Sequence, residues 1–222
     1  MIVAIDGPSG AGKSTLAKRI AKEFGLTYLD TGAMYRALAL KVLRHGLDLT
    51  DQESLTRVVG STEIDLRERE GKLEVLLDGK EVSDLIRTPE VSQMASRVSA
   101  LPVVRRRMLE LQRARGQRGG VVAEGRDIGT VVFPQAEVKI YLDASTEERA
   151  RRRFDELCAA GRTVNLEDTL REMEQRDRRD SERDLAPLRK AEDALAIDSS
   201  GLSAEVVAAR AIEVIRNRDL QK

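Results

Sequence analysis

The stretch "AIDGPSGAGKSTLAKRIAKEFG", residues 4–25, decides the fold. It contains the pattern G-x-x-x-x-G-K-[ST], from Gly7 to Ser14, after the apolar run 2–5 and before a helical pattern. Glycines allow such a loop to point successive backbone N–H groups at an anion, at the positive end of a helix dipole. The sequence therefore predicts a phosphate-binding loop between a buried strand and a helix.

Side chains of this loop predict how a nucleotide is held. The Lys13 ammonium would reach the β- and γ-phosphates, and the Ser14 hydroxyl would ligate a Mg²⁺ ion that keeps most of its waters. The helix that follows is predicted to end at Gly25, which suits a left-handed cap. We expect the nucleotide-binding residues of the loop to be Gly7, Pro8, Ser9, Gly10, Ala11, Gly12, Lys13, Ser14 and Thr15.

Composition limits the other classes of function. The 222 residues suit one domain with insertions, and 38 basic residues balance 38 acidic ones, which argues against a broad nucleic-acid-binding surface. Aromatic residues make up 3%, too few for base-stacking platforms. The single cysteine, Cys158, excludes an intrachain disulfide, and no apolar run has membrane-spanning length. We expect a cytoplasmic monomer, with no nucleic-acid or membrane partner.

Strand-like apolar runs alternate with helical segments along the chain. The runs are residues 2–6, 27–30, 121–124, 138–143 and 195–198. Strand–helix–strand order is typical of an α/β protein with a parallel sheet, and ligands of such sheets bind beyond the carboxyl ends of the strands. The sequence thus predicts a five-stranded parallel sheet flanked by helices, a P-loop NTPase fold.

One segment interrupts this alternation. Residues 62–82 alternate apolar and polar side chains around the turn signals "EG" and "DG", which predicts a small antiparallel sheet. Helices are predicted to begin at Pro89 and Pro102, because proline suits the first helical position. These elements indicate an inserted subdomain, residues 58–118.

A helix near residues 166–183 turns charged on its inward face. Leu166, Leu170 and Met173 form an apolar stripe that continues, at helical spacing, as Arg176, Asp180 and Arg183. Charged side chains are buried when they are paired or when a ligand completes them. An internal ion pair of Asp180 with Arg176 or Arg183 and a ligand site are both compatible with this pattern.

Four arginines are predicted at the sheet edge that holds the phosphate-binding loop. Arg126 follows the third core strand, Arg36 follows the second, and Arg176 and Arg183 lie on the charged stripe. One phosphate-binding loop with several separate arginines suggests two phosphorylated ligands, a nucleoside triphosphate and an acceptor that already carries a phosphate.

With these residues assembled, the sequence closely resembles the bacterial-type cytidylate kinases (CMP/dCMP kinases), which are P-loop nucleoside monophosphate kinases. The resemblance covers nearly the whole chain. It rests on the ordered motifs "IDGPSGAGKST", "LDTGAMYRALAL", "IRTPEVS", "GRDIGTVVFP" and "RDRRDSERDLAPL", and on the insertion with its small antiparallel sheet.

The resemblance implies transfer of a phosphoryl group from ATP, with Mg²⁺, to CMP or dCMP, giving ADP and CDP or dCDP, in pyrimidine nucleotide metabolism. It implies one P-loop kinase domain, residues 1–222, in which 58–118 is a monophosphate-binding subdomain and 149–178 a short helical lid. From this lid Arg149 and Arg153 would reach the ATP phosphates; ordinary surface ion pairs are the alternative for both. The implied catalytic residues are Lys13, Arg126, Arg176 and Arg183, and the implied CMP-binding residues are Thr31, Arg36, Ser96, Arg105, Arg126, Asp127, Arg176, Asp180 and Arg183.

Within that set, the resemblance implies that Ser96, Arg105 and Asp127 read cytosine. Cytosine offers an N4 amine donor with N3 and O2 acceptors, so it suits a carboxylate or hydroxyl on one side and a guanidinium on the other. Uracil reverses the pattern at N3 and C4 and leaves buried polar groups unpaired.

Three other functions stay open at this point. A kinase for UMP, AMP or a small metabolite would share the phosphate-binding loop but not the cytosine-reading residues. A non-catalytic nucleotide switch of the GTPase kind would need an N-K-x-D motif, which the sequence lacks. A nucleic-acid-binding protein is disfavoured by zero net charge and few aromatic residues.

Overall fold

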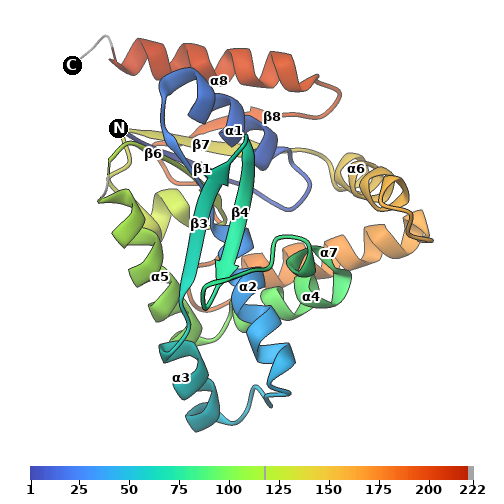
Figure 1. Ribbon diagram of the computed structural model, residues 1–222. Helices are drawn as coiled ribbons and strands as arrows, with labels where there is room; N and C mark the ends of the chain where they lie inside the picture. Colours follow the sequence, from blue (N-terminus) through green and yellow to red (C-terminus); the bar gives the residue numbers. More distant parts are fainter. Residues whose placement is uncertain (118, 220–222) are drawn as a thin grey trace. The chain divides into compact units, whose positions relative to one another are not determined.

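The computed structural model describes residues 1–117 and 119–219 (Figure 1). Residue 118, the end of the predicted subdomain, and residues 220–222 of the predicted domain lie outside this part. In chain order the elements are β1 (Ile2–Asp6), α1 (Lys13–Phe24), β2 (Thr27–Asp30), α2 (Thr31–Arg44), α3 (Gln52–Gly60), β3 (Ile64–Arg69), β4 (Lys72–Leu77), β5 (Lys80–Glu81), the 3₁₀ turn η1 (Leu85–Arg87), α4 (Pro89–Val98), α5 (Pro102–Gly116), β6 (Val121–Gly125), the π-helical turn η2 (Ile128–Val132), β7 (Val138–Asp143), α6 (Thr146–Ala159), α7 (Leu166–Glu182), β8 (Leu195–Asp198) and α8 (Ala204–Asp219).

The predicted five-stranded parallel sheet is confirmed, with strand order β2-β6-β1-β7-β8. β1 pairs in parallel with β6 on one side and with β7 on the other, and β7 pairs in parallel with β8. Because β1 is central, the loop that follows it lies between loops that follow β6 and β7, more than a hundred residues later in the chain.

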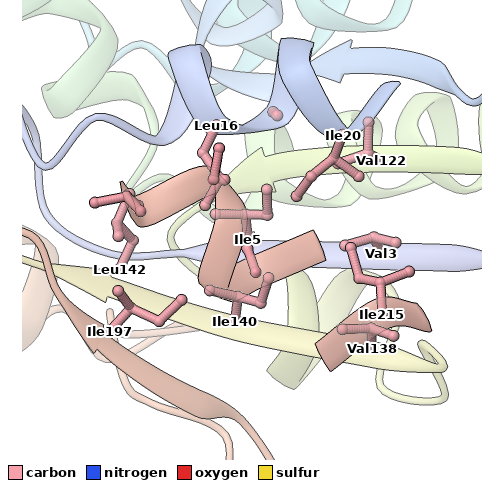
Figure 2. Packing of buried hydrophobic residues seen from close by; sticks show 14 of the residues in the cluster. Val3, Ile5, Leu16, Ile20, Val122, Val138, Ile140, Leu142, Ile197 and Ile215 are labelled. Atoms are coloured by element: carbon pink, nitrogen blue, oxygen red, sulfur yellow. The ribbon is translucent and has the colours of Figure 1, made fainter. Parts of the chain in front are cut away.

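The core of this sheet is aliphatic, as the low aromatic content predicts. Figure 2 shows Val3 and Ile5 of β1 with Ile140 of β7 among the buried side chains of the cluster. Helices α1 and α8 contribute Leu16, Ile20, Val207, Ala208, Ala211 and Ile215 to the same cluster. Burial of α1 against the sheet fixes the phosphate-binding loop at both of its ends.

Helix ends match the local signals in the sequence. Gly25 caps α1 in the left-handed conformation, and its N–H donates to the Ala21 carbonyl. Pro89 and Pro102 begin α4 and α5, and the Thr88 side chain caps α4 by accepting from the Val91 N–H. Ser145 caps α6 in the same way through the Glu148 N–H.

The predicted antiparallel sheet is also present, with order β3-β4-β5. Its first turn has positive φ at Glu70 and Gly71, and its second has positive φ at Asp78 and Gly79. Two consecutive residues of positive φ match the twist of antiparallel strands in a tight hairpin. The "EG" and "DG" pairs therefore set the register of this sheet.

The chain divides into two compact units, Met1–Tyr28 with Arg118–Lys222, and Leu29–Gln117. The first carries the phosphate-binding loop and most of the parallel sheet. The second carries α2–α5 and the antiparallel sheet, and the predicted subdomain lies within it as far as Gln117.

Candidate functional site

The phosphate-binding loop joins β1 to α1 and depends on three glycines with positive φ. Gly7, Gly10 and Gly12 have φ values of 148°, 79° and 94°. A Cβ atom on Gly7 would lie 1.9 Å from the Leu142 carbonyl oxygen of β7, so a side chain there would collide with the backbone. Glycine is thus required both by conformation and by the close approach of the neighbouring strand.

Lys13 is the first residue of α1 and is buried. Its Nζ donates to the Pro8 carbonyl at 2.5 Å, which holds the side chain across the loop. Burial lowers the pKa of Lys13, as does the charge of Arg126, while Glu124 and Asp6 oppose the shift. A buried ammonium beside a guanidinium favours binding of an anion, because an anion offsets both charges.

Two buried carboxylates end the strands beside this lysine. Asp6 closes β1 and accepts from the backbone N–H groups of Ile128 and Gly129 at 2.8 and 2.7 Å. Burial outweighs these hydrogen bonds and raises the pKa of Asp6 to about 6. Glu124 of β6 accepts from the Tyr28 hydroxyl. Both carboxylates end strand runs that the sequence predicts, 2–6 and 121–124, but their partners were not predicted.

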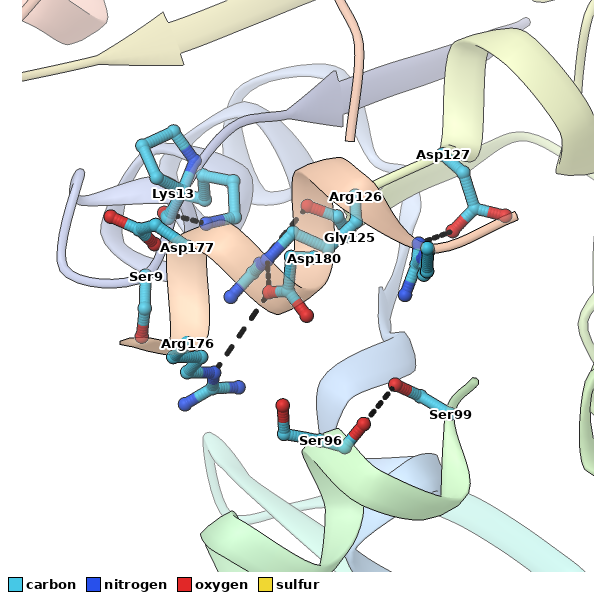
Figure 3. Close-up of polar contacts among 12 residues, drawn as sticks. Ser9, Lys13, Ser96, Ser99, Gly125, Arg126, Asp127, Arg176, Asp177 and Asp180 are labelled. Carbon is cyan, nitrogen blue, oxygen red and sulfur yellow. Dashed lines mark hydrogen bonds and ion pairs between the residues drawn. The ribbon is translucent and has the colours of Figure 1, made fainter. Parts of the chain in front are cut away.

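The charged stripe of α7 pairs with the loop after β6 (Figure 3). The principal partner of Asp180 is Arg126, whose Nε lies 2.9 Å from the Asp180 Oδ2 atom, while the Nε of Arg176 lies 4.0 Å from that oxygen. Burial raises the pKa of Asp180, but Arg126 and Arg176 outweigh it and hold that pKa below its usual value. The sequence pattern predicted a buried ion pair of Asp180 but did not predict Arg126 as its partner.

Arg183 pairs with Asp127 rather than continuing the helix. Helix α7 ends at Glu182, and Arg183 is its extended C-cap residue. Its guanidinium donates to Asp127 at 3.3 Å and, through Nε, to the Ala186 carbonyl at 2.7 Å. Both side chains of the pair are buried. The predicted site residues Arg126, Asp127, Arg176, Asp180 and Arg183 are thereby brought into one network.

The two arginines predicted on the lid have different surroundings. Arg149 is buried and donates to the Ser9 carbonyl of the phosphate-binding loop at 3.2 Å and to Asp177 at 2.5 Å. It also donates to the Ala144 carbonyl and the Thr146 hydroxyl. Arg153 instead pairs with Glu156 one turn later, the surface pair that was its alternative. Asp177 was not predicted as a partner, since nothing in its spacing separates it from the solvated residues around it.

In the Leu29–Gln117 unit, Thr31 and Arg36 lie at the start of α2. Asp30 caps the helix by accepting from the Ala33 N–H, and Arg36 pairs with the same carboxylate at 3.3 Å. A Cβ atom on Gly32 would lie 3.2 Å from both the Arg36 Nη1 and the Asp30 Oδ1 atoms. Glycine at this position therefore leaves room for that ion pair, beside the buried Thr31.

Ser96 and Arg105 come together in the same unit through Ser99. The Ser99 hydroxyl donates to the Ser96 carbonyl at 2.8 Å, and Arg105 donates to the Ser99 carbonyl at 3.2 Å. Figure 3 shows the Ser96 hydroxyl separate from its bonded carbonyl. This hydroxyl is buried and, within the described residues, makes no hydrogen bond. A buried hydroxyl that lacks a hydrogen bond within the protein can gain one from a bound ligand.

Across residues 1–117 and 119–219, no group of three or more His, Cys, Asp or Glu side chains is arranged to hold a metal ion. None of the helices in this part of the chain is long and apolar enough to span a bilayer.

Comparison with known proteins agrees with these features. The family model for cytidylate kinase matches residues 3–217. The chain is 50% identical over 219 residues to the cytidylate kinase of Carboxydothermus hydrogenoformans, covering 99% of each chain. It is 53% identical over 206 residues to that of Pelotomaculum thermopropionicum, covering 92% of this chain and 91% of the relative. An uncharacterized protein from Eubacterium ventriosum shares the fold, with a TM-score of 0.55 at 12% identity over 98% of both chains. The predicted family is confirmed, and the chain belongs to the cytidylate kinases.

Proposed function

We propose that the loop from Gly7 to Thr15 binds the phosphates of ATP and that the arginine network of the same unit binds the acceptor phosphate. As a member of its family, the chain catalyses phosphoryl transfer from ATP to CMP or dCMP, giving ADP and CDP or dCDP, in pyrimidine nucleotide metabolism. The observation that carries the site proposal is the buried Lys13 beside Arg126. Lys13 begins α1 directly after a loop of three positive-φ glycines, and the combination of such a loop, a helix N-terminus and a buried lysine favours a polyanionic ligand.

For the acceptor nucleotide, we propose that one set of residues binds the phosphate region and another binds the base. Arg36, Arg126, Arg176 and Arg183 bind the phosphate region, with Thr31 and Asp180 as further nucleotide contacts. Ser96, Arg105 and Asp127 bind cytosine. The unsatisfied Ser96 hydroxyl supports the second assignment, because a base edge in this position would supply its missing hydrogen bond.

The proposed cofactor is Mg²⁺, carried with ATP. Ser14 is exposed at the N-terminus of α1, directly after Lys13, so its hydroxyl fits a metal that takes most of its ligands from phosphates and water. When bound, Mg²⁺ would neutralise charge on the β- and γ-phosphates. Ser14→Ala should raise the Mg²⁺ concentration needed for half-maximal turnover, measured by titration at saturating ATP. An unchanged midpoint would contradict the assignment of Ser14.

The residues of the chain contribute positioning and charge. An acceptor phosphate oxygen is already anionic, so it needs no strong general base as nucleophile. Lys13 would hold the transferred phosphoryl group in line with that oxygen, and Arg126, Arg176 and Arg183 would offset charge as it moves between oxygens. Arg149 would keep the phosphate-binding loop in shape through the Ser9 carbonyl.

Further features of the predicted organisation belong to this proposal. Residues 58–118 act as the monophosphate-binding subdomain and residues 149–178 as a lid that excludes water. Arg149 and Arg153 contact the ATP phosphates from this lid, and Arg153 exchanges its surface pair with Glu156 for that contact. The protein acts as a cytoplasmic monomer without a nucleic-acid partner. Sedimentation of the purified protein, with and without nucleotides, tests the monomeric state.

The test of the base assignment is an ADP-release assay with ATP, Mg²⁺ and CMP, dCMP, UMP, AMP or GMP as sole acceptor. We expect strong preference for CMP and dCMP, and Ser96→Ala should reduce the ratio of kcat/KM for CMP to that for UMP. Ser92→Ala is the matched control, because the Ser92 hydroxyl lies one turn earlier in α4 and already donates to the Thr88 carbonyl. An unchanged ratio in Ser96→Ala would overturn the role of Ser96, while preference for another acceptor would overturn the whole cytosine-reading set.

A further inference from the structure

Asp6 links two functional loops within the Met1–Tyr28 and Arg118–Lys222 unit. It is the last residue of β1, directly before Gly7, and its register partner in β6 is Gly125, directly before Arg126. The Asp6 side chain is 4% exposed, and each carboxylate oxygen accepts one backbone N–H, from Ile128 and from Gly129. One side chain thus connects the start of the phosphate-binding loop to the start of η2.

The segment that Asp6 holds is the one that carries Arg126 and Asp127. The side chains of these two residues are tied to α7 and its C-cap, by Asp180 and Arg183. The next two residues, Ile128 and Gly129, supply the backbone N–H groups that donate to the Asp6 carboxylate. Gly129 packs closely here, since a Cβ atom on it would lie 3.4 Å from the Asp6 Oδ2 atom and 3.1 Å from the Lys139 Cδ atom.

We propose that Asp6 is a positioning residue that holds the Arg126–Gly129 segment against the phosphate-binding loop and so orients Arg126 and Asp127 toward the acceptor nucleotide. The inference rests on the proposed roles of Arg126 and Asp127. Hydrogen bonds from backbone N–H groups to a carboxylate are about twice as strong as neutral ones, and two of them from successive residues fix both position and rotation of that backbone. Because misplacement of a binding group by about 1 Å can cost about a hundredfold in rate, such a link affects turnover without touching substrate.

The first test is Asp6→Asn, compared by steady-state kinetics with the unchanged chain. An amide NH₂ would face one of the two N–H donors, so one hydrogen bond is lost. We expect KM for CMP to rise at least about fivefold and kcat to fall about tenfold, with KM for ATP changed less than about twofold. The control is Asp198→Asn, because Asp198 also ends a strand of this sheet and accepts from the Ser200 N–H, but is exposed.

The second test approaches the same contact from the other side. Gly129→Ala adds a methyl group between Asp6 and Lys139 and leaves the phosphate-binding loop unchanged. We expect the same selective rise in KM for CMP, and this variant carries the test if Asp6→Asn does not fold. Unchanged CMP kinetics in Gly129→Ala would overturn the positioning role. So would an Asp6→Asn variant in which KM for ATP rises as much as KM for CMP.

A third variant separates this inference from the proposed function. Asp127→Asn tests whether the held segment contacts the acceptor at all. Normal CMP kinetics in Asp127→Asn would mean that the proposed role of Asp127 fails. Impaired CMP kinetics in Asp127→Asn, with Asp6→Asn and Gly129→Ala both normal, would instead overturn the role of Asp6 alone.

Discussion

The buried ion pair between Arg126 and Asp180 makes a quantitative prediction about stability. The perturbation is Asp180→Asn, which keeps the size of the side chain and removes its charge. Arg126 then loses the charged carboxylate that its Nε contacts at 2.9 Å, and Arg176 loses the same partner. Removal of one partner from a buried ion pair is strongly destabilising, because the remaining charge is left uncompensated.

The expected loss of stability in Asp180→Asn follows from how deeply the ion pair is buried. The Asp180 side chain is 6% exposed and that of Arg126 is 16% exposed. For such a pair, loss of one partner lowers the free energy of unfolding by about 3 kcal/mol, the low end of the range, because asparagine retains an acceptor oxygen. In a protein of this size about 3 kcal/mol corresponds to a fall in Tm of about 6–12 °C.

The assay is thermal unfolding without nucleotides, followed by circular dichroism from pH 7 down to pH 3. The folded-state pKa of Asp180 lies below the usual 3.8, so its stabilisation is present above that value and is lost as pH falls through the folded-state pKa. The Tm difference between wild type and Asp180→Asn should therefore be full at pH 7 and should shrink only below about pH 4.

Glu156→Gln provides the matched control. Glu156 forms an ion pair of 3.1 Å with Arg153 in the helix before α7, but its side chain is 66% exposed. Surface ion pairs contribute little to the free energy of unfolding, so the Tm of Glu156→Gln should stay within about 2 °C of wild type. If Asp180→Asn is as stable as Glu156→Gln at pH 7, the reasoning that the buried pair supports the folded state is refuted.

Three further predictions concern the phosphate-binding loop. Lys13→Ala should lower kcat/KM by orders of magnitude in the ADP-release assay, because the phosphates lose their buried cation; near-normal turnover would contradict the role of the loop. Arg149→Lys should raise KM for ATP more than KM for CMP in the same assay, since an ammonium cannot replace the four contacts of the guanidinium, and equal effects would contradict a role local to the loop. Burial raises the folded-state pKa of Asp6 to about 6 against 3.8 unfolded, against its backbone hydrogen bonds, with the charge of Asp127 adding to the shift and that of Lys13 opposing it. The stabilisation by protonated Asp6 is therefore present below pH 3.8 and is lost as pH rises through 6. In melting curves from pH 4 to 7, the free energy of unfolding of wild type should fall by about 2 kcal/mol relative to that of Asp6→Asn, and parallel pH profiles of the two proteins would contradict this pKa.

Local signals in the sequence were enough to predict the core strands, the two tight turns and the starts of two helices. The five core strands, the turns at Glu70–Gly71 and Asp78–Gly79, and the proline starts of α4 and α5 were all predicted and are all present. These features depend on residues a few positions apart, through side-chain alternation, allowed φ values and caps. The phosphate-binding loop was equally predictable, because its backbone conformation requires glycine at fixed positions.

The partners of the site residues were decided by tertiary structure alone. The strand order places β1 between β6 and β7, so Asp6 meets the N–H groups of Ile128 and Gly129, 122 and 123 residues away in sequence. The same arrangement brings Arg126 to Asp180, where the sequence pattern had indicated only that Asp180 needed a cation. Helical spacing tells which side chains face inward, but the side chain that meets them belongs to another element. By itself, then, the sequence determined which groups are buried and charged, while the packing of β1, β6 and α7 determined which of them neutralise one another, because a long-range ion pair leaves no periodic signal along the chain.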